Sequence, residues 1–154
     1  MEQSKALSIS WKVYAVFLIV GIVITTINIV NPMDIYVNEP FEIYTEDSWS
    51  TFAAEQPKQA GLYEHFNRSA AGGAFSTVLL GLFITLTAYR KGEKWAWIAL
   101  VAGLVAFNAI QMVVSYMMTG GVLHNVLWMC PGLVILLLPM KDFLSQKATI
   151  ETKV

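Results

Sequence analysis

Residues 95–117 read WAWIALVAGLVAFNAIQMVVSYM, a stretch that contains no Asp, Glu, Lys or Arg. The hydrocarbon core of a bilayer is about 30 Å thick, and a helix needs about 20 apolar residues to cross it. A helix also satisfies its own backbone hydrogen bonds, as lipid requires. The stretch therefore predicts a transmembrane helix, with Trp95 and Trp97 at one membrane surface.

Three further charge-free runs lie on either side of this one, at roughly 13–30, 69–89 and 122–139. Only 14% of the chain is charged, whereas soluble domains carry about 25%. We therefore expect an all-α, polytopic membrane protein, a four-transmembrane-helix bundle that forms a single domain over residues 1–154. The helices are expected at about 12–31, 60–90, 94–118 and 121–140, with an outer loop at 32–59 and a cytoplasmic tail at 141–154.

Charges flanking these runs predict the orientation. Basic residues precede the first run, fill the second connection and follow the fourth run, namely Lys5, Lys12, Arg90, Lys91, Lys94, Lys141, Lys147 and Lys153. The first connection instead carries mainly acidic residues, namely Asp34, Glu39, Glu42, Glu46, Asp47, Glu55 and Glu64 against Lys58 and Arg68. Because Lys and Arg favour the cytoplasmic side, both termini are expected in the cytoplasm of a cell-membrane protein.

The outer connection shows local structure of its own. Residues 45–56 are expected to form a short helix on the membrane surface, with Trp49 and Phe52 on one face. Pro57 suits the first position of the next helix, which would then begin well outside the lipid. On that helix Glu64 precedes Arg68 by four residues, the favourable order for an ion pair.

Small side chains recur at four-residue steps down the second predicted span, at Ser69, Gly73, Thr77, Gly81 and Thr85. Such stripes let membrane helices approach closely. Packing within the monomer and contact with a second copy both remain open.

Polar side chains inside lipid are costly and need an explanation. The inner half of the predicted bundle is expected to hold no comparable group. The candidates gather in the outer half and are Asn28, Arg68, Asn108, Gln111 and His124. One interpretation is a ligand pocket that opens outward, with Asn108 and Gln111 as its floor and Arg68 and His124 on its rim. The other is a hydrogen-bond network that holds the helices together.

Catalysis and metal binding are the sharper alternatives. His124 is the candidate for acid–base chemistry, because histidine is the residue type that exchanges protons near neutral pH. Glu64 is the carboxylate candidate to orient it. His65, His124 and Glu64 form the smallest set that binds a metal or haem, but their spacing matches no known metal signature. We expect no cofactor. Coupled transport is disfavoured because no ionisable residue lies deep in the predicted membrane region.

Other classes are excluded by composition and motifs. The net charge of -1 provides no basic field for nucleic acid. Cys130 is the only cysteine, which excludes an intrachain disulfide. Hydrolase, nucleotide-binding and zinc-protease signatures are missing from the sequence.

Between about Tyr63 and Gly121 the chain carries Glu64, Arg68, Gly72-Gly73, Gly81 and the stretch from Arg90 to Trp97. With these residues it resembles small prokaryotic membrane proteins of the DoxX-like and DUF4345-like kind. The resemblance implies a four-helix bundle and a prokaryotic origin, and it carries over no catalytic residue. The long acidic loop departs from the compact pattern of that family.

The leading functional hypothesis is a non-catalytic membrane component. It would pack against other membrane subunits or a second copy of itself, or bind a lipid-like molecule in its outer half. The alternative is a membrane enzyme that acts on an amphipathic or isoprenoid-like substrate through His124 and Glu64, with Arg68, Asn108 and Gln111 fixing the substrate.

Overall fold

The computed structural model describes residues 4–33, 41–42, 45–119 and 123–145. Within these ranges every regular element is a helix, which confirms the all-α prediction. Three helices are long and apolar enough to cross a membrane: α1 (Lys5–Val30), α4 (Pro57–Thr87) and α5 (Lys94–Thr119). The shorter elements are α3 (Trp49–Glu55), η1 (Tyr89–Lys91), α6 (Leu123–Leu137) and α7 (Met140–Leu144).

The fourth predicted span is shorter than expected. A span was predicted at 121–140, but α6 has only 15 residues and ends at Leu137. Pro139 explains the end of the helix because proline has no backbone N–H and disfavours helical geometry in the preceding residue. The chain then forms α7, so the start of the predicted tail is helical. The rest of that tail, 146–154, lies outside the described residues.

Helix starts follow their local sequence. Ser4 caps α1 by accepting a hydrogen bond from the N–H of Leu7 at 3.1 Å. Ser48 caps α3 through the N–H of Thr51 at 3.2 Å. Pro57 occupies the first turn of α4, as the sequence predicts. The short helix expected within 45–56 is present as α3.

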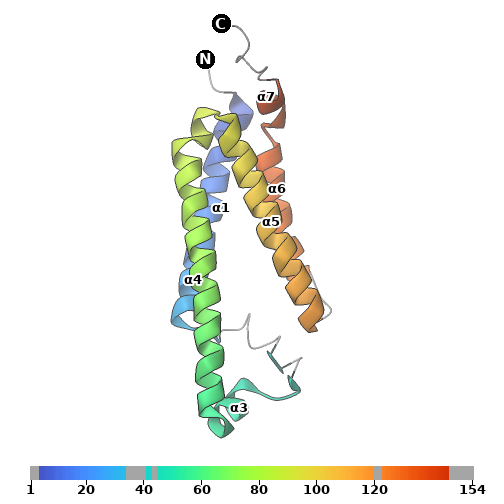
Figure 1. Cartoon of the computed structure of the whole chain (residues 1–154). Coiled ribbons are helices and arrows are strands. Elements are labelled where there is room, and N and C mark those ends of the chain that lie inside the picture. The colour runs from blue at the N-terminus through green and yellow to red at the C-terminus, as the bar shows by residue number, and fades with distance from the viewer. Residues whose placement is uncertain (1–3, 34–40, 43–44, 120–122, 146–154) are drawn as a thin grey trace, which may run out of the picture.

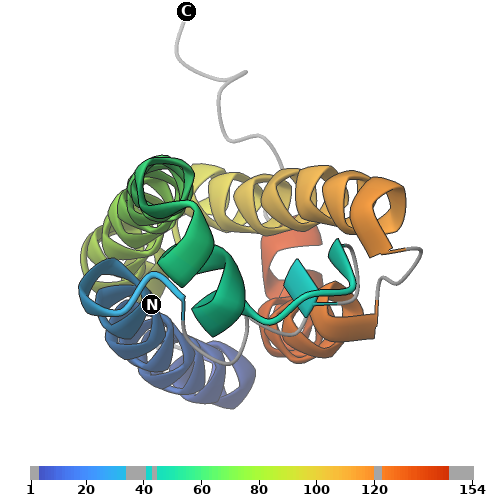
Figure 2. The same cartoon turned by 90° about the horizontal axis from the view of Figure 1, so that it is seen from below.

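Four helices form two antiparallel pairs, α1 with α4 and α5 with α6 (Figure 1). We call the end formed by the start of α1, η1 and α7 the basic end, and the end formed by α3 and the start of α4 the loop end. The pairs meet at the basic end and diverge toward the loop end (Figure 1). Seen from the loop end, α1 and α4 lie to one side, α5 and α6 to the other, and α3 projects between them (Figure 2).

The buried core lies in the half of the bundle nearer the basic end. Its members come from α1, the turn after α4 with η1, and α5 to α7: Leu7, Tyr14, Leu18, Ala88, Tyr89, Ala96, Leu100, Leu136 and Phe143. The ring of Phe143 stacks on Trp97 at 5.3 Å and on Tyr89 at 5.8 Å between centroids. This stack fixes α7 over the end of the bundle where the two helix pairs join.

The small-residue stripe of α4 divides into two parts. Gly81 faces Leu18 and Leu100, and Thr85 is fully buried, so this part packs within the monomer. Ser69, Gly73 and Thr77 are exposed, and no side chain lies near the position of a Cβ at Gly73. The stripe therefore serves internal packing only nearer the basic end.

Candidate functional site

Polar side chains of α5 and α6 meet between these two helices. The amide nitrogen of Asn125 donates to the Ser115 hydroxyl at 2.8 Å and lies 3.5 Å from the Gln111 carbonyl oxygen. One turn before Gln111, Asn108 is only 5% exposed and donates to the Leu104 carbonyl at 2.9 Å. The shared face follows from the three- and four-residue spacing of these positions on α5.

Contacts between helices fix the level of this group. Phe17 of α1 lies against Trp128 of α6, with 6.0 Å between ring centroids. A Cβ at Gly132 would meet Leu104 of α5, one turn before Asn108. Phe17 and Asn108 are therefore at similar levels. Asn28 follows Phe17 by eleven residues in α1, which places it about 16 Å nearer the loop end.

Asn28 belongs to the interface between α1 and α4. A Cβ at Gly21 would lie 3.2 Å from Val78, so in this antiparallel pair Asn28 lies at the level of Ala71. The amide oxygen of Asn28 is buried and has no hydrogen-bond partner among the described residues. A buried oxygen without a partner costs about 1–3 kcal/mol. Among the predicted site residues whose side chains the structure describes, Asn28 is the one with such an atom.

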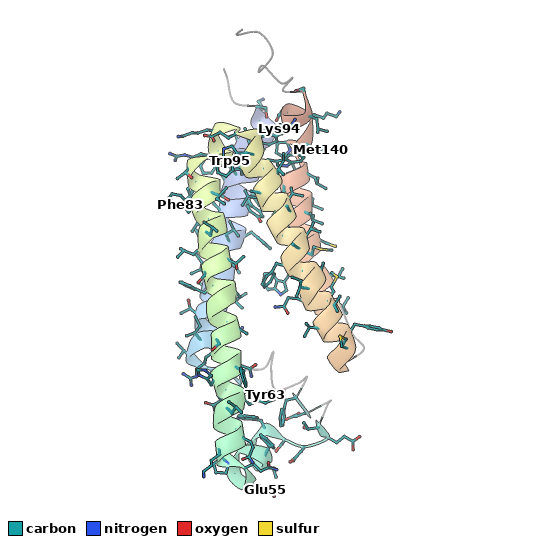
Figure 3. The ribbon with its side chains drawn as sticks, in the orientation of Figure 1. Glu55, Tyr63, Phe83, Lys94, Trp95 and Met140 are labelled. Carbon is teal, nitrogen blue, oxygen red and sulfur yellow. The ribbon has the colours of Figure 1, made fainter. Side chains whose placement is uncertain are left out.

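Glu64 and Arg68 form the predicted ion pair on α4. Glu64 Oε2 and Arg68 Nη2 are 3.6 Å apart, and the side chains are 39% and 49% exposed. Exposed pairs of this kind contribute roughly 0–1 kcal/mol. The pair lies on the first third of α4, near Tyr63 at the loop end (Figure 3).

The histidine candidates are not brought into one described cluster. His65 is exposed, with its ring 6.1 Å from that of Phe66. The side chain of His124 lies outside the described part of the structure. In the ranges that are described, three His, Cys, Asp or Glu side chains do not gather at one point.

The predicted single polar layer is thus divided between the two helix pairs. Asn108 and Gln111 lie between α5 and α6, while Asn28 and Arg68 belong to the other pair and lie nearer the loop end. Counting residues along each helix places groups correctly within that helix. It does not reveal how far one helix is shifted along another, and that shift separates Arg68 of the predicted rim from the predicted floor.

A hollow on α5 does not coincide with the predicted pocket. It is shallow, has a volume of about 300 Å³ and is lined by Ala109, Ile110, Val113 and Val114. All four side chains are exposed and apolar. Neither Asn108 nor Gln111 contributes to the lining.

A buried polar network lies at the basic end and was not predicted from the sequence. Ser10 donates to the Ile135 carbonyl at 2.6 Å and lies 2.6 Å from the Tyr89 hydroxyl. The Trp97 indole N–H donates to the Leu136 carbonyl at 2.8 Å. The signal was Pro139, which has no N–H to offer the carbonyl four residues before it.

The fold and polar groups define a small all-α chain with three helices of membrane-spanning length. Comparisons of the chain with known protein families, with curated proteins and with solved structures find no match. Function is therefore inferred from the residues and contacts of the chain itself.

Proposed function

We propose that the chain is a membrane protein with four spans. The support for the fourth span is that α6 runs beside α5 and is hydrogen-bonded to it near both ends, through Asn125 to Ser115 and through Leu136 to Trp97. From Trp97 to Ser115, α5 rises about 27 Å, close to the roughly 30 Å of a hydrocarbon core. If α5 crosses the membrane, α6 lies beside it and rises about 16 Å of that depth from Asn125 to Leu136.

The same proposal places both termini in the cytoplasm. At the basic end the described residues include six cations and two anions, namely Lys5, Lys12, Arg90, Lys91, Lys94 and Lys141 against Glu93 and Asp142. At the loop end they include five anions and two cations, namely Glu42, Glu46, Asp47, Glu55 and Glu64 against Lys58 and Arg68. This asymmetry supports a cytoplasmic basic end.

Within the membrane the chain acts as a non-catalytic component whose diverging half receives an apolar partner, either another membrane subunit or a lipid-like molecule. One observation carries this role. The main cluster of buried side chains lies in the half nearer the basic end, while nearer the loop end large apolar side chains of the diverging helices stay exposed. Examples are Phe66 on α4 and Ile110 and Val113 on α5.

The chemistry of these surfaces suits close helix contact. Ser69, Gly73 and Thr77 on α4 permit close backbone approach to an incoming helix or chain. Asn108 and Gln111, between α5 and α6, supply polar groups of the kind that join helices in lipid. Packing would contribute more than hydrogen bonds to the binding of a partner subunit or lipid-like molecule.

Purification in mild detergent tests this role. We expect the wild-type protein to be recovered with a stoichiometric membrane partner or a bound lipid-like molecule, identified by native mass spectrometry. Gly73→Leu should lower that recovery by blocking close approach. Gly72→Leu is the matched control, since its Cβ also meets no neighbour but points to another side of α4. Recovery of wild-type protein only as a bare monomer contradicts the role.

The geometry favours this role over the enzymatic alternative. Glu64 is held in an exposed ion pair on α4, whereas Asn108 and Gln111 lie between α5 and α6 and farther from the loop end. A single small substrate would have to bridge these levels. Unchanged turnover of an identified substrate after His124→Ala and Glu64→Gln would eliminate acid–base chemistry at these residues.

A further inference from the structure

Lysines at the basic end come from separate segments of the chain and all are exposed. They are Lys5 and Lys12 of α1, Lys91 of η1, Lys94 of α5 and Lys141 of α7. Figure 3 shows Lys94, Trp95 and Met140 together at this end, far from Glu55 and Tyr63. The fold thus brings five lysines from three separate stretches of the sequence to one end of the helices.

The carboxylates at this end are engaged by neutral donors. Asp142 accepts a hydrogen bond from the Ser4 hydroxyl, and Glu93 accepts one from the Trp95 indole. Among the residues that the structure describes, the ion pair is between Glu64 and Arg68, at the opposite end. The five lysines therefore keep their charge available for an anion from outside the protein.

Packing holds the lysine-bearing segments in place. The hydrogen bond from Ser4 to Asp142 ties α7 to the start of α1. The turn after η1 lies on α1, because a Cβ at Gly92 would come within 3.2 Å of Leu7. Gly92 has φ of 80°, a left-handed conformation that suits glycine. The segments that carry the lysines are therefore held in place relative to one another.

Apolar surface continues directly from these charges. On α1, Lys5 and Lys12 share a face with Ile9 and Val16, which are 55% and 61% exposed. The Lys12 ammonium lies 5.6 Å from the centroid of the Trp11 ring. Lysines and tryptophans beside exposed aliphatic side chains match a molecule with an anionic head and an apolar tail.

We propose that the basic end is a binding surface for anionic phospholipid headgroups in the leaflet that it faces. The inference rests on the proposed membrane insertion and adds the chemistry of the lipid that occupies this end. A phospholipid is chosen over a soluble phosphate because the lysines border the exposed apolar faces of helices long enough to span a membrane. Each lysine near an anionic surface contributes roughly fivefold to binding.

The test uses the full chain in bilayers made from equal parts of phosphatidylglycerol and phosphatidylcholine. After gentle extraction, native mass spectrometry counts the lipids that remain bound. We expect wild-type protein to retain phosphatidylglycerol preferentially. Lys91→Gln and Lys94→Gln should each reduce that preference roughly fivefold, and more when combined. Lys58→Gln, the same change at the loop end, should leave it unaltered.

The outcomes separate this inference from the proposed function. Equal retention of both lipids by wild-type protein that resists alkaline extraction would overturn the inference and leave membrane insertion standing. Protein released by alkaline extraction would refute insertion and the inference together. An effect of Lys58→Gln equal to that of Lys91→Gln, or displacement of phosphatidylglycerol by inorganic phosphate, would also overturn the inference.

Discussion

Pro139 deprives the end of α6 of a backbone N–H donor, and two side chains distant in sequence supply hydrogen bonds there. In an uninterrupted helix the Ile135 carbonyl would accept from residue 139, which here has no N–H. Ser10 donates to that carbonyl, and Trp97 donates to the carbonyl of Leu136 next to it. Because Ser10 is fully buried, water cannot replace this bond. The end of α6 thus depends on side chains from α1 and α5.

Ser10→Ala should therefore destabilise the protein. The change leaves the Ile135 carbonyl and the Tyr89 hydroxyl each without one partner, at a cost of about 1–3 kcal/mol. We expect the midpoint of thermal unfolding in detergent, measured by circular dichroism, to be lower than that of the wild-type protein. Ser8→Ala is the control, since the described residues give its hydroxyl no hydrogen bond and it lies on the same helix. Equal midpoints for the two variants would refute the role of Ser10.

Gly132 lies at a close contact between α5 and α6. An added Cβ would lie 2.8 Å from Leu104 Cδ2 and 3.4 Å from Phe17 Cε1. Gly132→Ala should be nearly neutral, because Leu104 can shift and alanine gains about 1 kcal/mol in helix propensity. Gly132→Leu should cost about 1–3 kcal/mol through overpacking, measured by the same thermal unfolding.

Gly103→Leu provides the comparison for this contact. Gly103 also lies within a long helix, but no atom is within 4 Å of the position of its Cβ. We expect its unfolding midpoint to stay near that of the wild-type protein. If Gly103→Leu lowered the unfolding midpoint as much as Gly132→Leu, the effect would come from helix propensity or solubility rather than from the contact with Leu104.

At the scale of elements, the sequence predicts most features that depend on a single helix, such as its length and its start. Charge-free length identifies α1, α4 and α5, and Pro57 marks the start of α4. It does not predict which faces pack. Buried Leu18 and exposed Ile19 are adjacent on α1 and equally apolar, because lipid and protein interior select the same side chains. The shift that separates Asn28 from Asn108 arises from contacts between helices and has no signature in either helix.

The loop end contains an element-scale contact that is independent of the main core. Phe41 is only 4% exposed, and its ring lies 5.2 Å from Trp49, 5.2 Å from Phe52 and 5.6 Å from Tyr63 between centroids. These aromatic contacts hold α3 against the start of α4. None of the four residues belongs to the core cluster nearer the basic end.

Phe41→Ala should release α3 without weakening the bundle. Truncation of a buried phenylalanine costs about 3–5 kcal/mol. Here we expect that lost stability to favour local opening of α3 rather than unfolding of the bundle. We expect cleavage by a Glu-specific protease at Glu46 or Glu55 to accelerate at least roughly tenfold, with little change in the thermal midpoint. Phe66→Ala, which removes an exposed ring, should leave cleavage unchanged. A lower midpoint with unaltered cleavage would contradict this account.

At the scale of the whole molecule, the proposed fourth span depends on the side of the membrane on which α7 lies. Ser4 bonds to Asp142, and Phe143 stacks between Tyr89 and Trp97. These contacts place the end of α7 beside the start of α1. A chain with only three spans would put the two on opposite sides of the membrane and break every one of these contacts.

Single cysteines in a Cys130→Ser background distinguish the two topologies. With an impermeant maleimide on intact cells, we expect Glu55→Cys to react, and Lys91→Cys to react only after permeabilisation. Ser145→Cys, just after α7, should behave like Lys91→Cys. Its labelling from outside would exclude the fourth span and the contacts of α7 at the basic end, whereas equal labelling of Glu55→Cys and Lys91→Cys would exclude a crossing by α4 itself.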